Sequence, residues 1–299
     1  MAGSSFLIAF IILFAVYLLA STAGLISEKS GVTNIAINGT MIMGALAYVS
    51  LASWATYWEA FGVFAPFVTL LFAVLIGMIY AQVLSFATVN LMTDQIITGT
   101  ALNLFAPILS SSILFLDYFK VDQVPFPTTE LSWYVVPLAF LIIASIIILF
   151  VILLLNKTAF GLRLISAGEN PLALEGVGYS ARKMRWQALI ISGALAGLAG
   201  GMFMFYNASL FTGAVNGSGY IALAIVVIGK WKLKGIILWS FVFALIFACT
   251  IPLMYWIPNI PYELMNIIPF LIPLVVLCIF KSKNNSKSCG VPFKKNIQE

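Results

Sequence analysis

The 299-residue sequence contains no histidine, three cysteines and only 8% charged residues. Without histidine it lacks the usual proton shuttle near neutral pH and the commonest metal ligand. Cys249 and Cys278 lie in apolar runs and Cys289 lies in a basic tail, so the cysteines predict neither a disulfide framework nor a metal cluster. These absences argue against an enzyme, and we expect no cofactor bound by the chain itself.

A phosphate-binding loop is also missing from the sequence. The pattern G-x-x-x-x-G-K-[ST] does not occur, because the Gly229-Lys230 pair is followed by Trp231. Any ATP used for transport must therefore be bound by a separate subunit. Glu28 and Asp94 lie at the ends of apolar runs, and no acidic or basic residue stands convincingly inside one, which argues against a transporter driven by protons or ions. Sodium could still be bound by carbonyls and hydroxyls.

Hydrophobic residues make up 62% of the chain, whereas soluble domains have roughly 45–50% apolar and about 25% charged residues. The fold class that this predicts is an all-α polytopic membrane protein with about nine transmembrane helices. No stretch between the apolar runs is long and mixed enough for a soluble core. We expect one membrane domain over residues 1–280, followed by a basic cytoplasmic tail, residues 281–299.

Apolar runs near the roughly 20 residues that cross a bilayer define the expected spans. They are residues 6–26, 32–53, 62–87, 95–116, 134–155, 186–207, 219–229, 235–251 and 265–280. The run 219–229 is too short to cross alone, so it is either a re-entrant element or a crossing that borrows flanking residues. Six tryptophans lie near span ends, where an interfacial belt is expected: Trp54, Trp58, Trp133, Trp186, Trp231 and Trp256.

Charge predicts how the chain is oriented. If 219–229 crosses, every Lys and Arg of the 15 except Lys120 falls on one face. The positive-inside rule then places the N-terminus outside the cell and the C-terminus inside. The basic residues also meet anionic membrane lipid, which accounts for the net charge of +5 without nucleic-acid binding.

Two polar, glycine-containing stretches open spans that run in opposite directions, residues 31–41 and 212–220. Irregular backbone at membrane depth is tolerated where it is buried or lines a cavity, and paired interruptions are typical of inverted-repeat transporters. The sequence therefore predicts a possible inverted repeat. Neutral amides and hydroxyls near these stretches suit a polar, uncharged solute, or alternatively bridge helices. The candidate pathway residues are Asn34, Asn38, Gln95, Thr98 and Asn103, the two asparagines being expected on one helical face.

A polar docking loop, residues 156–185, separates two long apolar runs and holds five Lys and Arg residues. Asn170 and Pro171 predict the cap and first residue of a two-turn helix. Exposed apolar residues there suggest burial against a partner protein, and the alternative is a helix lying flat on the lipid. The predicted contact residues are Glu169, Asn170, Pro171, Leu172, Ala173, Leu174, Glu175 and Gly176. Elsewhere, Gly193, Gly197 and Gly201 form a small-residue strip that predicts close helix packing.

Four stretches in this order resemble the permeases of bacterial ABC importers for nucleosides and simple sugars, related to the ribose and branched-chain amino acid permeases. They are SEKSGVTNI at 27–35, DQIITGTALN at 94–103, TAFGLR with GENP at 158–171, and ISGALAGLAG with GYIALA at 191–224. The chain departs from the family pattern at Asn38, usually acidic, and at Leu233, usually proline.

The resemblance implies an importer in the bacterial plasma membrane. It implies a second, longer permease that forms a heterodimer with this chain, a cytoplasmic ABC ATPase that receives the docking loop as a coupling helix, and an extracellular solute-binding lipoprotein. Nucleosides are the first expected substrate class and simple sugars the second. Two other classes stay open: a stand-alone secondary transporter or channel, and a membrane-embedded enzyme, for which no nucleophile with an adjacent base is found.

Overall fold

The computed structural model describes residues 2–55, 64–115, 130–207, 211–256 and 289–290, and the regular elements in these ranges are all helices. In chain order they are α1 (Ala2–Lys29), α2 (Ile37–Ala55), α3 (Ala65–Ser85), the π-helix η2 (Phe86–Asn90), α4 (Gln95–Leu114), α5 (Glu130–Lys157), α6 (Ala159–Glu169), α7 (Pro171–Gly176), α8 (Ala181–Asn207), α9 (Ser218–Ile228) and α10 (Leu233–Trp256). The predicted all-α membrane class is confirmed.

Within the described ranges, six helices are long and apolar enough to cross a membrane: α1, α3 with η2, α4, α5, α8 and α10. Helices α2 and α9 are shorter. The 11 residues of α9 rise only about 16 Å, so it cannot cross a hydrocarbon core of about 30 Å alone. The predicted span 265–280 lies outside the described residues, and nine crossings remain a prediction.

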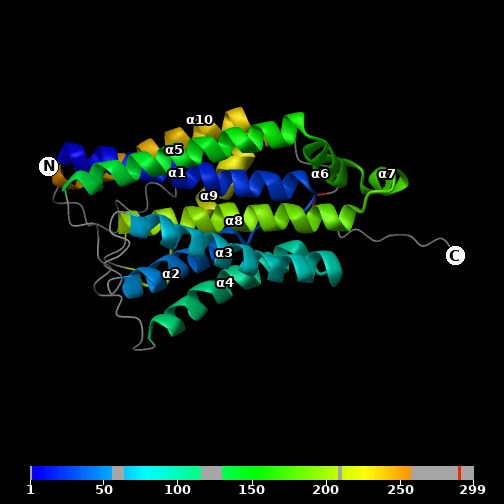
Figure 1. Cartoon of the computed structure of the whole chain (residues 1–299), viewed down its shortest axis with the longest axis horizontal. Coiled ribbons are helices and arrows are strands. Elements are labelled where there is room, and N and C mark those ends of the chain that lie inside the picture. The colour runs from blue at the N-terminus through cyan, green and yellow to red at the C-terminus, as the bar shows by residue number, and fades with distance from the viewer. Residues whose placement is uncertain (1, 56–63, 116–129, 208–210, 257–288, 291–299) are drawn as a thin grey trace.

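When the shorter helices α2 and α9 are counted with the six long ones, successive helices alternate in direction and form a flattened bundle (Figure 1). The docking loop, with α6 and α7, projects from one end, and α1 begins at the other. Nine Lys and Arg residues lie in the described ranges, and all occur in segments at the docking-loop end: Lys29, Lys157, Arg163, Arg182, Lys183, Arg185, Lys230, Lys232 and Lys234. The predicted segregation of positive charge therefore holds for the described part of the chain.

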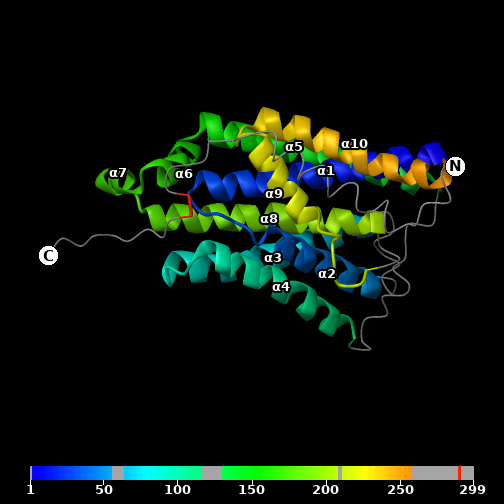
Figure 2. The same cartoon turned by 180° about the vertical axis from the view of Figure 1, so that it is seen from behind.

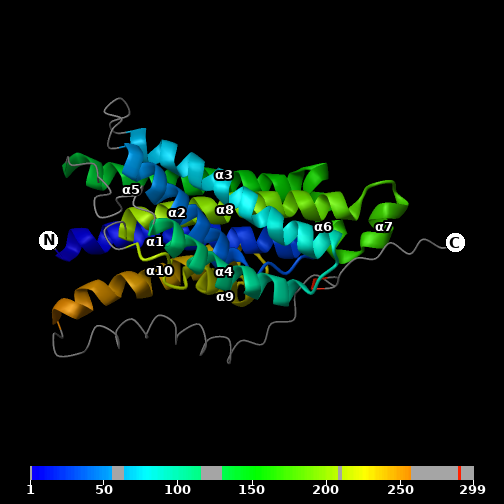
Figure 3. The same ribbon diagram turned by 90° about the horizontal axis from the view of Figure 1, so that it is seen from below.

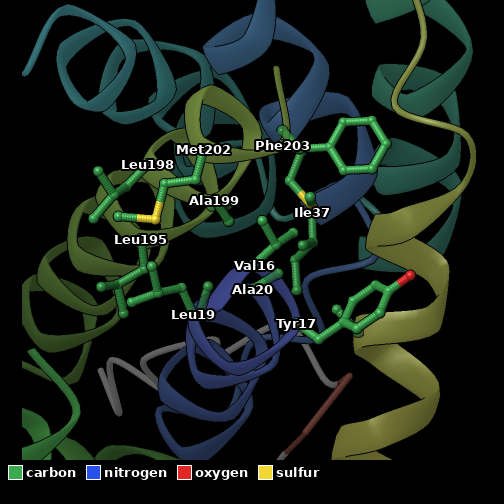
Figure 4. Close-up of a cluster of buried hydrophobic side chains, with 14 of the residues drawn as sticks. Val16, Tyr17, Leu19, Ala20, Ile37, Leu195, Leu198, Ala199, Met202 and Phe203 are labelled. Atoms are coloured by element: carbon green, nitrogen blue, oxygen red, sulfur yellow. The ribbon is translucent and has the colours of Figure 1, made fainter. Parts of the chain in front are cut away.

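Helices α1 and α8 form the centre of the bundle, and their apolar windows are 67% and 83% buried. Side chains from one face of α1 meet α8 and the start of α2 in a continuous apolar cluster (Figure 4). Val16, Leu19 and Ala20 come from α1, and Leu195 and Met202 come from α8. The other helices pack around this pair.

The glycine strip of α8 packs directly on α3, as predicted. A Cβ atom at Gly193 would lie 2.7 Å from the Gly77 carbonyl oxygen, and one at Gly197 would lie 2.5 Å from that of Ala73. A Cβ at Gly201 would lie 2.8 Å from Leu70. Small residues let the two backbones approach closely, which gives helices in lipid much of their mutual attraction.

The structure differs from the expectation at the start of one span, and it adds a helix to the docking loop. The span expected over 32–53 begins as a helix only at Ile37, because the chain leaves α1 through a turn at Gly31, whose φ is +88°. The docking loop holds two helices, since α6 precedes the short helix that its Asn-Pro signal predicted. Both differences shape the functional site.

Candidate functional site

The segment between α1 and α2 is an irregular stretch whose backbone groups are held by side chains of α4. The Thr33 amide donates to Gln95 Oε1 at 2.7 Å. Asn103 Nδ2 donates to the Ile35 carbonyl at 2.7 Å, while its Oδ1 accepts from the Gly39 amide at 2.6 Å. These bonds replace the helical partners that the interruption removes, which is the condition for irregular backbone within a membrane protein.

Asn34 and Asn38 do not share a helical face, contrary to our expectation, because Asn34 precedes the first residue of α2. Asn34 is 1% exposed, and its Nδ2 donates to Ser192 Oγ on α8 at 3.0 Å. Asn38 Oδ1 instead accepts from the Gly219 amide on α9 at 3.2 Å. The two amides therefore tie the interrupted segment to different helices.

The starts of α2 and α9 lie against each other at this point. A Cβ atom at Gly219 would lie only 2.3 Å from the Cα of Asn38, so the backbones touch. Helix α9 follows a turn in which Asn216 and Gly217 have φ of +47° and +67°. From there α9 crosses α1 and ends near the docking-loop end (Figure 2). The two interruptions noted in the sequence thus meet, as paired broken helices do in transporters.

Four of the five predicted pathway residues surround the interrupted segment: Asn34, Asn38, Gln95 and Asn103. Thr98 lies apart from them, half-buried, and donates to the Asp94 carbonyl at 2.7 Å. Asn103 uses both ends of its amide on backbone. Asn34 Oδ1 and Gln95 Nε2 are buried and have no hydrogen-bond partner among the described residues. One acceptor and one donor are therefore still available there, and contact with solute stays a prediction.

The docking loop is built from two capped helices. Thr158 Oγ1 accepts from the Gly161 amide at 3.1 Å and caps α6. Asn170 Oδ1 accepts from the Ala173 amide at 3.1 Å, and Pro171 is the first residue of α7, as the sequence predicted. A threonine before a run of helix formers is itself a start signal, so α6 was detectable in the sequence.

Leu174 was expected to be exposed and is instead 4% exposed. It packs with Ala167, Ala181 and Met184, where α6, α7 and α8 converge. A six-residue helix has too few internal hydrogen bonds to be stable alone. Leu174 therefore anchors α7 to its neighbours and is not available to a partner.

The exposed apolar side chains of α7 and of the turn after it are Leu172, Val177 and Tyr179, which are 61%, 70% and 41% exposed. Arg163 of α6 stacks on the Tyr179 ring, with its guanidinium carbon 3.8 Å from the ring centre. The Nη2 of Arg163 also donates to the Tyr179 hydroxyl at 2.8 Å. This contact holds the end of the loop, so the exposed surface has a defined shape. Exposed apolar clusters on an otherwise polar surface mark interaction sites.

Two tryptophans assigned to the interfacial belt have interhelical partners that the sequence did not reveal. Trp231 is 8% exposed, and its Nε1 donates to the carboxylate of Glu28, itself 5% exposed at the end of α1. Glu28 is therefore a buried acid, which our sequence reading missed. Trp186 Nε1 donates to Asn90 Oδ1 of η2 at 3.0 Å. No local signal marks either pair, because their members lie 203 and 96 residues apart.

The sequence of the chain is similar to those of known membrane-transport proteins. Residues 6–277 match the family described as branched-chain amino acid transport system / permease component. The chain is 30% identical over 298 residues to the nucleoside ABC transporter permease protein NupC of Lactococcus lactis, covering 92% of each chain. It is 32% identical over 300 residues to the guanosine ABC transporter permease protein NupQ of Bacillus subtilis, covering 93% of this chain and 92% of that protein.

A second Bacillus subtilis protein, the guanosine ABC transporter permease protein NupP, is 33% identical to the chain over 99 residues. That match covers 32% of this chain and 28% of NupP. No solved structure matches the chain.

Proposed function

Because the chain belongs to the family of branched-chain amino acid transport system permease components, we propose that it is the permease subunit of an ATP-driven importer in the bacterial plasma membrane. Its substrates are nucleosides, with simple sugars as the second class. A separate cytoplasmic ATPase drives it, and an extracellular solute-binding lipoprotein delivers the solute. The chain itself carries out no covalent chemistry.

The docking loop is the observation that carries this proposal. It is a folded projection with exposed apolar side chains at the basic end of a membrane bundle, and the positive-inside rule assigns this end to the cytoplasm. A soluble ATPase would meet this projection first. The loop leads directly into α8, the most deeply buried candidate span of the described chain.

The first turns of α8 connect the loop to the rest of the bundle. Trp186 is bonded to Asn90 of η2, and a Cβ at Gly31 would lie 3.0 Å from Arg185 Nη2. A displacement of the loop would therefore reach both the turn after α1 and the π-helix before α4. Single-turn π segments frequently occur at functional sites. ATP shifts the permease between two packings only if the ATPase binds them with different affinity.

The nucleoside preference is supported by chemistry and by the relatives. The partnerless atoms Asn34 Oδ1 and Gln95 Nε2 offer one acceptor and one donor, which suits a neutral solute with mixed hydrogen-bonding edges. Buried polar atoms without partners are few in proteins and call for an explanation. NupC and NupQ carry the words nucleoside and guanosine in their names.

A second permease is supported by the same relatives. NupQ and NupP are two guanosine transporter permeases of one organism, and both resemble this chain. We propose that this chain likewise works with a second, homologous permease.

The test uses the complex purified from its native membrane through a tag on this chain. Leu172→Asp removes an apolar contact worth about 2 kcal/mol when buried, or ~30-fold in Kd. We expect the ATPase to be lost while the permease stays monodisperse. Leu172→Met conserves volume and should retain the ATPase, and Leu162→Asp places the same charge on α6 at a side chain 70% exposed and should also retain it.

Uptake of labelled nucleoside by proteoliposomes provides the second readout. We expect the wild-type complex to require ATP and the Leu172→Asp preparation to be inactive. Uptake by this chain alone, without ATPase and ATP, would show a stand-alone transporter or channel instead. An ATPase that stays bound and stimulated in Leu172→Asp would show that the docking assignment is wrong.

A further inference from the structure

Helix α4 is exposed in the same proportion as α5 but is far less apolar. In both helices 28% of the apolar window is buried. The mean hydropathy of the α4 window is less than half that of α5, and it is the lowest among the six candidate spans of the described chain. The next lowest is α8, which is 83% buried, and α10 follows closely. A span as polar as α8 is expected to be surrounded by protein, and α4 is more polar still. Helix α5, in contrast, has the composition of a lipid-facing helix.

The exposed side chains show where this difference arises. On α5 the exposed mid-helix positions include Ile142, Ile146 and Leu149, with a single hydroxyl at Ser145. On α4 one stripe along the outer side mixes large aliphatic residues with small ones. Its members are all exposed: Ile97, Thr100, Ala101, Leu104, Ile108 and Ser112.

This mixture of large and small side chains is suited to contact with a neighbouring helix. Small residues and hydroxyls between larger aliphatic side chains allow helix backbones to approach, and they are enriched where membrane helices meet. Thr100 Oγ1 and Ser112 Oγ already donate to carbonyls of their own helix, at 2.9 and 2.7 Å. Their oxygens keep lone pairs that lipid tails cannot use and that a protein neighbour can.

The inner side of α4 touches both interrupted segments. Asn103 bonds Ile35 in the stretch before α2 and Gly39 in the first turn of α2. The stretch before α9 reaches α4 at Gly213, where a Cβ would lie 3.1 Å from the Ser111 nitrogen. A protein on the outer side of α4 would therefore be one helix away from the broken helices. Helices α4 and α5 lie at opposite edges of the bundle, and α4 is open to view from below (Figures 1 and 3).

We propose that the outer stripe of α4, defined by the six residues above, is the surface on which the second permease packs, while α5 faces lipid. This inference rests on the proposed function, which supplies the second permease. It adds the position of the interface, which places the two chains together beside the interrupted helices.

Site-specific photocrosslinking in the native membrane tests this interface. A benzophenone amino acid replaces Leu104 in the stripe, or Ile146 of α5 as a matched control; these aliphatic side chains are 70% and 61% exposed. We expect irradiation to link the Leu104 position to the second permease, identified by mass spectrometry of the adduct. The Ile146 position should give no protein adduct.

Three results would overturn the assignment: an adduct from Ile146 and none from Leu104, a Leu104 adduct with a second copy of this chain, or only lipid adducts at Leu104. Co-purification with the tagged wild-type chain shows whether the interface assignment or the proposed function is wrong. If the ATPase and second permease co-purify but Leu104 does not crosslink, the interface alone is wrong. If neither co-purifies, the importer proposal fails with it.

A steric variant provides an independent measurement. Ala101→Trp fills a gap in the stripe, and we expect it to reduce the co-purified second permease at least tenfold. Ile146→Trp enlarges a side chain on α5 and should leave the yield unchanged. An unchanged yield with Ala101→Trp would contradict the packing, because a tryptophan at the contact cannot be accommodated without separating the helices.

Discussion

Replacing Asn103 with leucine should destabilise the protein, because this side chain holds the irregular backbone before α2. Asn103 is 4% exposed and bonds the Ile35 carbonyl and the Gly39 amide at 2.7 and 2.6 Å. Leucine has the same branching and the same number of side-chain heavy atoms but leaves both backbone groups without partners. Each stranded group costs about 1–3 kcal/mol, which sums to about 2–6 kcal/mol.

Measurements on membrane proteins lower this figure. Interhelical hydrogen bonds there average only about 0.6 kcal/mol, because the unfolded chain in lipid also finds partners. Two average bonds would contribute about 1.2 kcal/mol. Ile35 lies in the turn before α2, and Gly39 lies in the first turn of α2, where amides have no acceptor within the helix. We therefore expect a loss of about 2 kcal/mol, which for 299 residues lowers the melting temperature by about 3 °C.

The assay is thermal unfolding of the detergent-solubilised protein, followed by intrinsic fluorescence. Ser145→Ala on α5 is the control, since its hydroxyl is exposed and donates to a carbonyl of its own helix at 2.8 Å. It should melt at the wild-type temperature. If Asn103→Leu also melted there, the structural role would be refuted. Lost nucleoside uptake without lost stability would favour direct contact of Asn103 with solute.

Three further predictions concern the helix starts and the docking loop. Gly219→Ala should prevent correct folding, because its Cβ would lie 2.3 Å from a backbone atom, and we expect aggregation on gel filtration. Gly176→Ala is the control and should be tolerated, because no atom lies within 4 Å of its Cβ position. Leu174→Ala should cost about 2 kcal/mol or more and speed proteolysis of the loop, whereas Leu172→Ala should leave proteolysis unchanged. Thr158→Ala should cost α6 about 1 kcal/mol and raise amide exchange of its first turn ~5-fold; unchanged exchange would contradict the cap.

Features set by local sequence were predictable. Apolar runs of membrane length gave the long helices to within a few residues, because lipid leaves a chain few alternatives to an uninterrupted helix. The Asn170-Pro171 cap and the strip of Gly193 and Gly197 were also predictable from local sequence. Helix capping and close helix packing both depend on which residue types occur at short spacing.

Features that depend on distant partners were not predictable. The start of α2 at Ile37 depends on Asn103 and Gln95, which bond the preceding stretch from another helix. The burial of Leu174 depends on how α6 and α8 converge. Likewise, the sequence identifies Glu28 only as a residue at a span end, and its burial beside Trp231 depends on the tertiary structure. In each case the deciding interaction joins segments whose meeting only the tertiary structure determines.

The location of the docking loop relative to the membrane tests the central claim most directly. In a variant lacking Cys249, Cys278 and Cys289, a single cysteine at Gly176 reports on the loop, and one at Phe64, 72% exposed, reports on the opposite end. We predict that a membrane-impermeant maleimide labels Phe64→Cys in intact cells and Gly176→Cys only in inverted vesicles. Labelling of Gly176→Cys from outside intact cells would contradict the assignment of this protein as a permease driven from the cytoplasm.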